Sequence, residues 1–166
     1  MDKKPKLLIK NADEQPWQET THGTTFGHRR KNLTMGEDGM MTFSLYELPP
    51  GKANWPYHYH CANEEIFYIL EGEGEVRTPE GRKTVRKGDI IRFPTGPDGT
   101  HQLINTGRSI LSYIDVDTTI EPDVIIYPDS EKINIMAGSA PGQDKGKRYL
   151  HKVLDKNAVK DYWEGE

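Results

Sequence analysis

Between residues 40 and 127 the sequence is a series of short strand-like runs separated by turn residues, and this pattern restricts the chain to an all-β fold. The dividers are rich in Gly and Pro, which favour turns and interrupt helices. Many short strands at near-regular spacing favour a closed barrel or a sandwich, because both architectures dispose of exposed sheet edges. The predicted strands are residues 40–48, 57–60, 65–70, 74–78, 83–86, 89–93, 102–105, 110–116 and 124–127.

The chain has 166 residues, which suits one domain with one core, and its segments suggest three parts. Residues 1–30 are expected to form an irregular N-terminal arm, because Pro5 and Pro16 interrupt any helix. Residues 31–127 are expected to form the β-barrel, and residues 128–166 a C-terminal extension packed on it. Within that extension, residues 153–163 carry the one weak helical pattern. Both extensions are expected to cover barrel edges, either those of the same chain or those of a neighbouring copy, and a homodimer is our hypothesis.

Charge, cysteine content and the lack of a long apolar run argue against nucleic-acid binding, an internal disulfide and a membrane span. The formal net charge of −4 provides no broad basic field for nucleic acid, and the basic run at residues 28–31 is interpreted as a solvated turn. The single cysteine, Cys61, excludes an internal disulfide. The apolar run at residues 7–9 is too short for a secretory segment or a membrane span, so we expect a cytoplasmic protein without a membrane partner.

The pair His58 and His60 is the first candidate for chemistry. Alternate residues of a strand point to the same face about 7 Å apart, so both imidazoles would be able to reach one ion. The competing interpretation is a pair of surface histidines. Cys61 has the opposite parity and is expected to be a small buried hydrophobe, while His22, His28 and His151 are expected to be exposed.

Glu65 and His101 complete a possible ligand set. Glu65 begins the next predicted strand and shares its face with Phe67 and Ile69, where a carboxylate is costly unless a positive charge pairs with it. The alternative is a solvated acid. Three imidazoles and one carboxylate suit one divalent transition metal such as Fe, Mn, Ni, Zn or Cu, and suit Mg or Ca poorly. In an octahedral site they leave two positions for water, dioxygen or a chelating substrate.

Two stretches resemble the motifs of the cupin superfamily. Residues 51–72, GKANWPYHYHCANEEIFYILEG, resemble the first motif, which has a glycine, a His-x-His pair, a glutamate and a second glycine. Residues 88–96, GDIIRFPTG, followed by HQLIN at residues 101–105, resemble the second. The loops before His58 and His101 are longer than in the motifs, which affects the pocket mouth more than the ligands. The resemblance implies a double-stranded β-helix, a jelly-roll-like barrel with a metal held by His58, His60, Glu65 and His101.

The resemblance leaves two functions open. The first is a small-molecule metalloenzyme of the dioxygenase or isomerase type that acts on an oxygen-donor substrate. The second is a non-catalytic module that binds or senses a sugar or a carboxylate. No catalytic residue beyond the ligand set can be assigned from the sequence. It also lacks the G-x-S-x-G, P-loop, Rossmann and H-E-x-x-H motifs, so hydrolase triads and nucleotide chemistry have no support.

Overall fold

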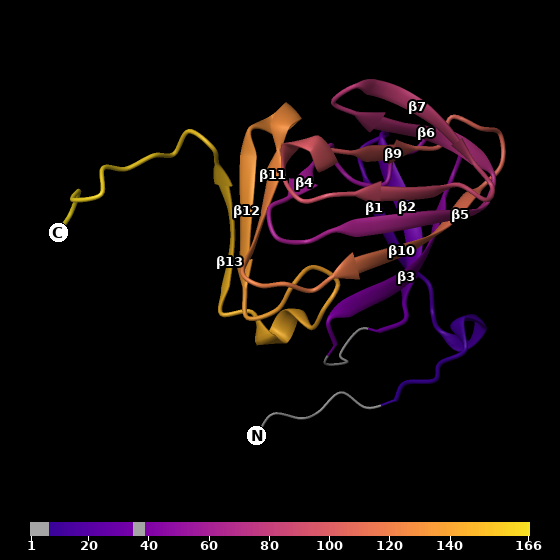
Figure 1. Ribbon diagram of the computed structural model, residues 1–166, viewed down its shortest axis with the longest axis horizontal. Coiled ribbons are helices and arrows are strands. Elements are labelled where there is room, and N and C mark those ends of the chain that lie inside the picture. Colours follow the sequence, from indigo (N-terminus) through magenta and orange to yellow (C-terminus); the bar gives the residue numbers. More distant parts are fainter. Residues whose placement is uncertain (1–6, 35–38) are drawn as a thin grey trace.

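The computed structural model describes residues 7–34 and 39–166, and these residues form an almost entirely β architecture (Figure 1). Four short 3-10 turns are present, and the described residues contain no α-helix. All nine strands predicted from the sequence are found within a few residues of their expected bounds. The strands are β1 Gln18–His22, β2 Phe26–Asn32, β3 Met41–Leu48, β4 Tyr59–His60, β5 Glu65–Glu71, β6 Glu73–Thr78, β7 Gly81–Arg86, β8 Ile90–Phe93, β9 Gln102–Ile104, β10 Leu111–Thr118, β11 Asp123–Tyr127, β12 Lys132–Ala137 and β13 Leu150–Asp155.

The strands form antiparallel sheets with the arrangement of a double-stranded β-helix. The large sheet has the order β1-β2-β3-β10-β5-β8, and two smaller sheets have the orders β13-β12-β11-β4 and β7-β6-β9. A bridge between His58 and His101 links the two smaller sheets. In Figure 1 the four-stranded sheet stands at the left and the three-stranded sheet lies at the top. The fold predicted from the sequence is therefore confirmed.

The interior-facing side of three neighbouring strands of the large sheet has an apolar end and a polar end. In β3, β5 and β10 alternate residues are buried, as the period of a strand requires. At one end these inward positions are apolar and join the main core, whereas at the other end they are polar. The apolar members are Tyr46, Leu48, Phe67, Ile69, Leu111 and Tyr113, and the polar members are Thr42, Ser44, Glu65, Asp115 and Asp117. The register sets Asp117 directly opposite both Thr42 and Glu65, so the polar ends coincide.

The N-terminal segment contains more regular structure than the expected irregular arm over residues 1–30. Residues 1–6 of that arm lie outside the described residues, and residues 7–17 contain only the 3-10 turn η1, Ala12–Glu14. The next residues form the β1–β2 hairpin, in which β2 pairs with β3 and extends the large sheet. Tertiary pairing here overrides a polar sequence with weak strand propensity. His28 is buried rather than exposed, and Cys61 is exposed rather than buried.

The C-terminal segment continues the four-stranded sheet. β12 pairs with β11, and β13 pairs with β12 over residues 150–155. The helix predicted over residues 153–163 is wrong, because this stretch starts in β13 and continues as turns. The tail after β13 points away from the sheets in Figure 1. In the described part of the chain, no helix has the length and hydropathy needed to cross a membrane.

Candidate metal centre

Main-chain pairing brings His58 and His101 together. His58 precedes β4, His101 precedes β9, and each main-chain N–H donates to the carbonyl of the other, with N–O distances of 3.1 and 2.8 Å. The imidazole centroids are 4.8 Å apart. The sheet therefore fixes the spacing of two histidines that are far apart in sequence.

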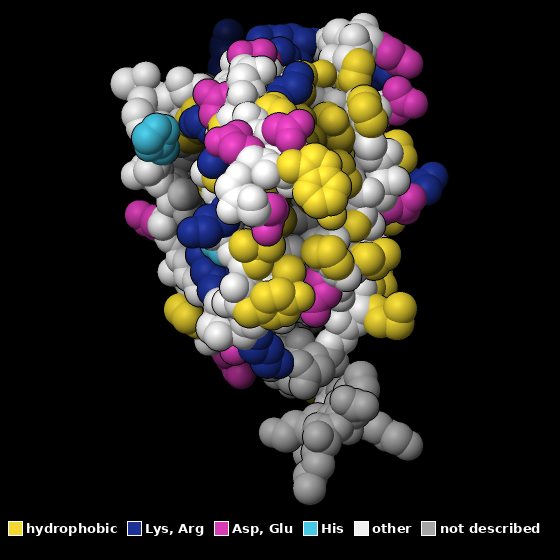
Figure 2. Space-filling model, turned by 90° about the vertical axis from the view of Figure 1, so that its left-hand side faces the viewer, with side chains coloured by type: hydrophobic (Ala, Val, Ile, Leu, Met, Phe, Trp, Pro, Cys, Tyr) yellow, Lys and Arg dark blue, Asp and Glu magenta, His cyan; other side chains and the backbone are white. Residues whose placement is uncertain are grey.

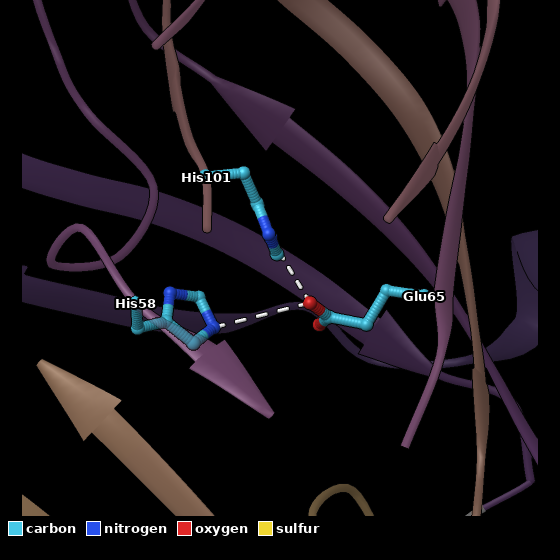
Figure 3. A group of neighbouring side chains, drawn as sticks. All are labelled: His58, Glu65 and His101. Carbon is cyan, nitrogen blue, oxygen red and sulfur yellow. Dashed lines mark ion pairs between the residues drawn. The ribbon is translucent and has the colours of Figure 1, made fainter. Parts of the chain in front are cut away.

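Glu65 is the point on which the three histidines converge. Its Oε2 lies 3.0 Å from Nε2 of His101 and 3.9 Å from Nε2 of His58, and its Oε1 lies 3.9 Å from Nε2 of His60. Figure 3 shows His58, Glu65 and His101 pointing toward one another. In this trio one ligand atom from each residue lies within 4.8 Å of the others. All four residues singled out from the sequence are buried, and the three histidines face the carboxylate of Glu65, although His60 lies outside the group of three.

Each imidazole is oriented by a hydrogen bond in which its Nδ1 takes part. Nδ1 of His58 donates to the carbonyl of Pro56 at 2.8 Å, and Nδ1 of His101 donates to that of Gly99 at 2.9 Å. Nδ1 of His60 lies 2.5 Å from Oδ2 of Asp123. A carbonyl oxygen only accepts, so Nδ1 of His58 and of His101 is the donor and Nε2 is the nitrogen that faces Glu65. This is the arrangement that metal-binding histidines adopt.

Two buried atoms of the group are suited to bind a cation. Nε2 of His101 and Oε2 of Glu65 have no hydrogen-bond partner among the described residues, although both are shielded from solvent. Leaving such atoms unsatisfied costs on the order of 1–3 kcal/mol each. A cation between them would accept both lone pairs, so the donor set fits a divalent transition metal.

Burial and neighbouring charges shift the pKa values of the group in different directions. Burial lowers the pKa of His58 to about 3, which keeps its imidazole neutral. Burial alone would lower the pKa of His60, but the carboxylates of Glu65 and Asp123 outweigh it and raise that pKa to about 9. Burial likewise opposes the ionised form of Glu65, yet His101 and His60 hold the pKa of Glu65 well below its usual range. The carboxylate is therefore charged before any ion binds.

Three aspartates beside the cluster were missed at the level of sequence. Asp115 and Asp117 lie on β10, and their carboxylates and that of Glu65 approach within 4.8 Å of one another. Burial, with the negative charge of Glu65, raises the pKa of Asp117 to about 7 and that of Asp115 well above its usual value. The sequence Asp-Val-Asp at residues 115–117 could have indicated this pair, because alternate residues of a strand point to the same face. Asp123 lies outside both motifs and has no comparable signal.

The cluster opens into a cavity of about 230 Å³. Three kinds of group share its lining: His58 and His60 with Glu65, the two β10 aspartates, and basic side chains. The basic members are Arg30, Lys145, Arg148 and His151. A larger hollow of about 450 Å³ between β7 and β8 has no histidine in its lining.

Comparison with known proteins identifies a family over the centre of the chain. The family described as "Cupin domain" matches residues 44–117, which include all four residues of the cluster. An uncharacterised protein of Methanocaldococcus jannaschii is 42% identical over 51 residues, which are 31% of this chain and 39% of that protein. An oxalate-binding protein of Thermotoga maritima is 32% identical over 74 residues, which are 45% of this chain and 59% of that protein. The matches span less than two thirds of both relatives.

Solved structures share the fold. A sugar phosphate isomerase from Silicibacter pomeroyi has a TM-score of 0.73 at 19% identity and covers 91% of this chain and 94% of its own. A Thermotoga maritima protein described as a predicted oxalate decarboxylase has a TM-score of 0.57 at 21% identity, and the match covers 67% of this chain and 98% of that protein. The polyketide cyclase RemF from Streptomyces resistomycificus has a TM-score of 0.57 at 18% identity, and the match covers 68% of this chain and 80% of that protein. At these identities the likeness establishes the architecture.

Proposed function

The chain contains a cupin domain over residues 44–117, and from this premise we propose that it binds one divalent transition-metal ion through His58, His60, Glu65 and His101. The convergence of three imidazole Nε2 atoms on one buried carboxylate carries the proposal. The unsatisfied Nε2 of His101 and Oε2 of Glu65 support it independently. Three nitrogens and one oxygen suit Fe, Mn, Ni or Zn.

We propose that the site acts on a small molecule that offers oxygen donors. A bound divalent ion would polarise such a donor as a Lewis acid. The cavity would place the substrate beside Asp115 and Asp117. These two carboxyl groups lie outside the ligand set, and Oδ1 of each has no hydrogen-bond partner among the described residues. Asp117, whose pKa burial raises to about 7, is suited to accept a proton from the substrate, and Asp115, whose pKa burial raises well above its usual value, is suited to donate one.

Of the two enzyme types, we favour an isomerase over a dioxygenase. Isomerisation requires groups that move a proton between substrate atoms, and Asp115 and Asp117 provide them inside the cavity. The similar fold of the Silicibacter pomeroyi sugar phosphate isomerase is in line with this choice. The alternative is a module that binds a small carboxylate without turnover. The oxalate-binding relative from Thermotoga maritima favours that alternative.

One pair of variants tests the metal proposal. Glu65→Gln removes the carboxylate charge at the centre, whereas Glu64→Gln changes the neighbouring residue, which pairs with Arg92 at the surface. We expect the purified wild-type protein and Glu64→Gln to retain one equivalent of metal by elemental analysis. Glu65→Gln should retain little. Equal retention in both variants would contradict the role of Glu65.

A substrate screen separates the candidate activities. Oxygen uptake with catechols, thiols or diketones would indicate a dioxygenase. Metal-dependent exchange of solvent deuterium into a sugar phosphate, lost in Asp117→Asn, would support the isomerase. Tight oxalate binding without exchange or oxygen uptake would favour the binding module.

We also propose that the chain forms a homodimer through β13. All residues of this edge strand are exposed, and Figure 2 shows hydrophobic side chains gathered on this face of the molecule. Leu150, Val153 and Leu154 are the apolar members on the strand. A two-fold axis at Val153 pairs β13 with its copy and sets His151 opposite Asp155, which gives opposite charges when the imidazole is protonated. A monomeric mass in solution would contradict the dimer.

A further inference from the structure

A loop between β12 and β13 places two cations in the same cavity as the histidine cluster. We call residues 138–149 the cationic loop; it contains the 3-10 turn η4, Lys145–Lys147. Lys145 and Arg148 line the cavity together with His58 and Glu65. Lys145 and Arg148 lie outside the segment that matches the family, which ends at residue 117.

Contacts with the large sheet hold this loop in place. The side chain of Asn32 on β2 donates to the carbonyl of Gly142 at 2.7 Å, and that of Gln143 donates to the carbonyl of Gly39 at 3.1 Å. Gly142 has a φ of +78° and lies against Thr42, where an added Cβ would approach the hydroxyl oxygen to 3.0 Å. The loop therefore reaches from the four-stranded sheet to the large sheet and is fixed at both.

The two cations have no acidic partner in the described residues. Arg148 donates from Nε to the carbonyl of Ser139 at 3.2 Å and from Nη2 to that of Ala140 at 3.0 Å. These bonds orient the guanidinium but do not neutralise it. Lys145 forms no ion pair within the described part of the chain, in contrast to Lys83, which pairs with Glu80. Glu65, Asp115 and Asp117 line the same cavity, but among the described residues no ion pair joins any of them to Lys145 or Arg148. Two positive charges without direct ion pairs favour an anionic occupant next to the loop.

We propose that the cationic loop forms an anion subsite for a phosphate group on the small molecule that occupies the cavity. This inference rests on the proposed function, because the oxygen-donor end of the ligand would lie at His58, Glu65 and His101. Two positive charges match the charge of about −2 on a phosphate better than the single charge of a carboxylate. A cavity of about 230 Å³ admits a ligand of only a few carbon atoms.

Calorimetry with phosphoglycolate and glycolate tests the subsite, because the two probes differ only by the phosphate. Each is titrated into the Mn-loaded protein and into the metal-free protein. We expect the wild-type protein to prefer phosphoglycolate by at least about tenfold, a difference of roughly 1.4 kcal/mol. Lys145→Ala and Arg148→Gln should each reduce that preference, and the double variant should remove it.

Lys152→Ala is the matched control, since Lys152 lies on β13 and does not line the cavity. It should keep the wild-type preference. Lys145→Ala removes a side chain without ion pairs, so its folding should be intact by circular dichroism. A preference unchanged in Lys145→Ala and in the double variant would overturn the subsite. Failure of the wild-type protein to bind metal would instead overturn the proposed function, and the metal-free titration would still decide whether phosphate is preferred.

Discussion

Oδ2 of Asp123 lies 2.5 Å from Nδ1 of His60, which joins a residue of β11 to a histidine of the candidate metal centre. Asp123 is fully buried, and its other oxygen accepts the main-chain N–H of Ala62 at 3.0 Å. The aspartate therefore fixes both the ring of His60 and the turn that follows it. A carboxylate in this position raises the basicity of an imidazole ligand.

Asp123→Asn should weaken metal binding without removing a ligand. The amide keeps the size of the side chain but loses the charge that stabilises His60, so the dissociation constant should rise about 10- to 100-fold. Competition with a chromophoric chelator measures this change. Asp129→Asn is the control, because Asp129 pairs with Arg77 at an exposed site. Equal affinities in the two variants would show that Asp123 has no role in the site.

His28 should make stability depend on pH. Burial lowers its pKa from 6.5 to about 4, so between these values the unfolded chain binds a proton that the folded chain does not. Its contribution is fully present above pH 6.5 and is lost as the pH falls toward 4, by about 3 kcal/mol in total.

Urea unfolding at several pH values checks the contribution of His28. His28→Phe preserves an aromatic ring against Trp55, which lies 4.4 Å from the imidazole between centroids. Its free energy of unfolding should fall less than that of the wild-type protein between pH 7 and pH 4. His22→Phe, at an exposed position, should follow the wild type. Parallel curves for wild type and His28→Phe would contradict the assignment.

Asp115→Val should stabilise the protein. Asp115 is 5% exposed, and its Oδ1 has no hydrogen-bond partner among the described residues. Replacing it with a β-branched apolar residue removes that cost and extends the core beyond Tyr113, so the free energy of unfolding should rise by about 1–2 kcal/mol. Chemical denaturation measures this difference. A loss of stability like that of a core deletion would mean that the carboxyl has a structural partner.

The strands and the common face of His58 and His60 were predictable from local spacing, whereas the grouping of Glu65 and His101 with them was predicted through the resemblance to the cupin motifs. Alternation between turns marked nine strands, and the His-x-His spacing gave His58 and His60 a common face. The cationic loop and Asp123 were not predictable, because only the fold brings them to the cavity. The β1–β2 hairpin and β13 were missed for another reason: their sequences are polar or mixed, and pairing with a neighbouring strand determines their conformation.

X-ray absorption spectroscopy of the protein loaded with Zn²⁺ tests the central proposal most directly. The proposed set of His58, His60, Glu65 and His101 predicts a first shell containing three imidazole nitrogens at about 2.0–2.1 Å and carboxylate oxygen at about 2.0–2.2 Å. In Glu65→Gln the spectrum should lose the carboxylate oxygen, and any Zn²⁺ that remains bound should keep its imidazole ligands. A shell with fewer than three imidazoles, or one unchanged in Glu65→Gln, would contradict the proposed metal centre.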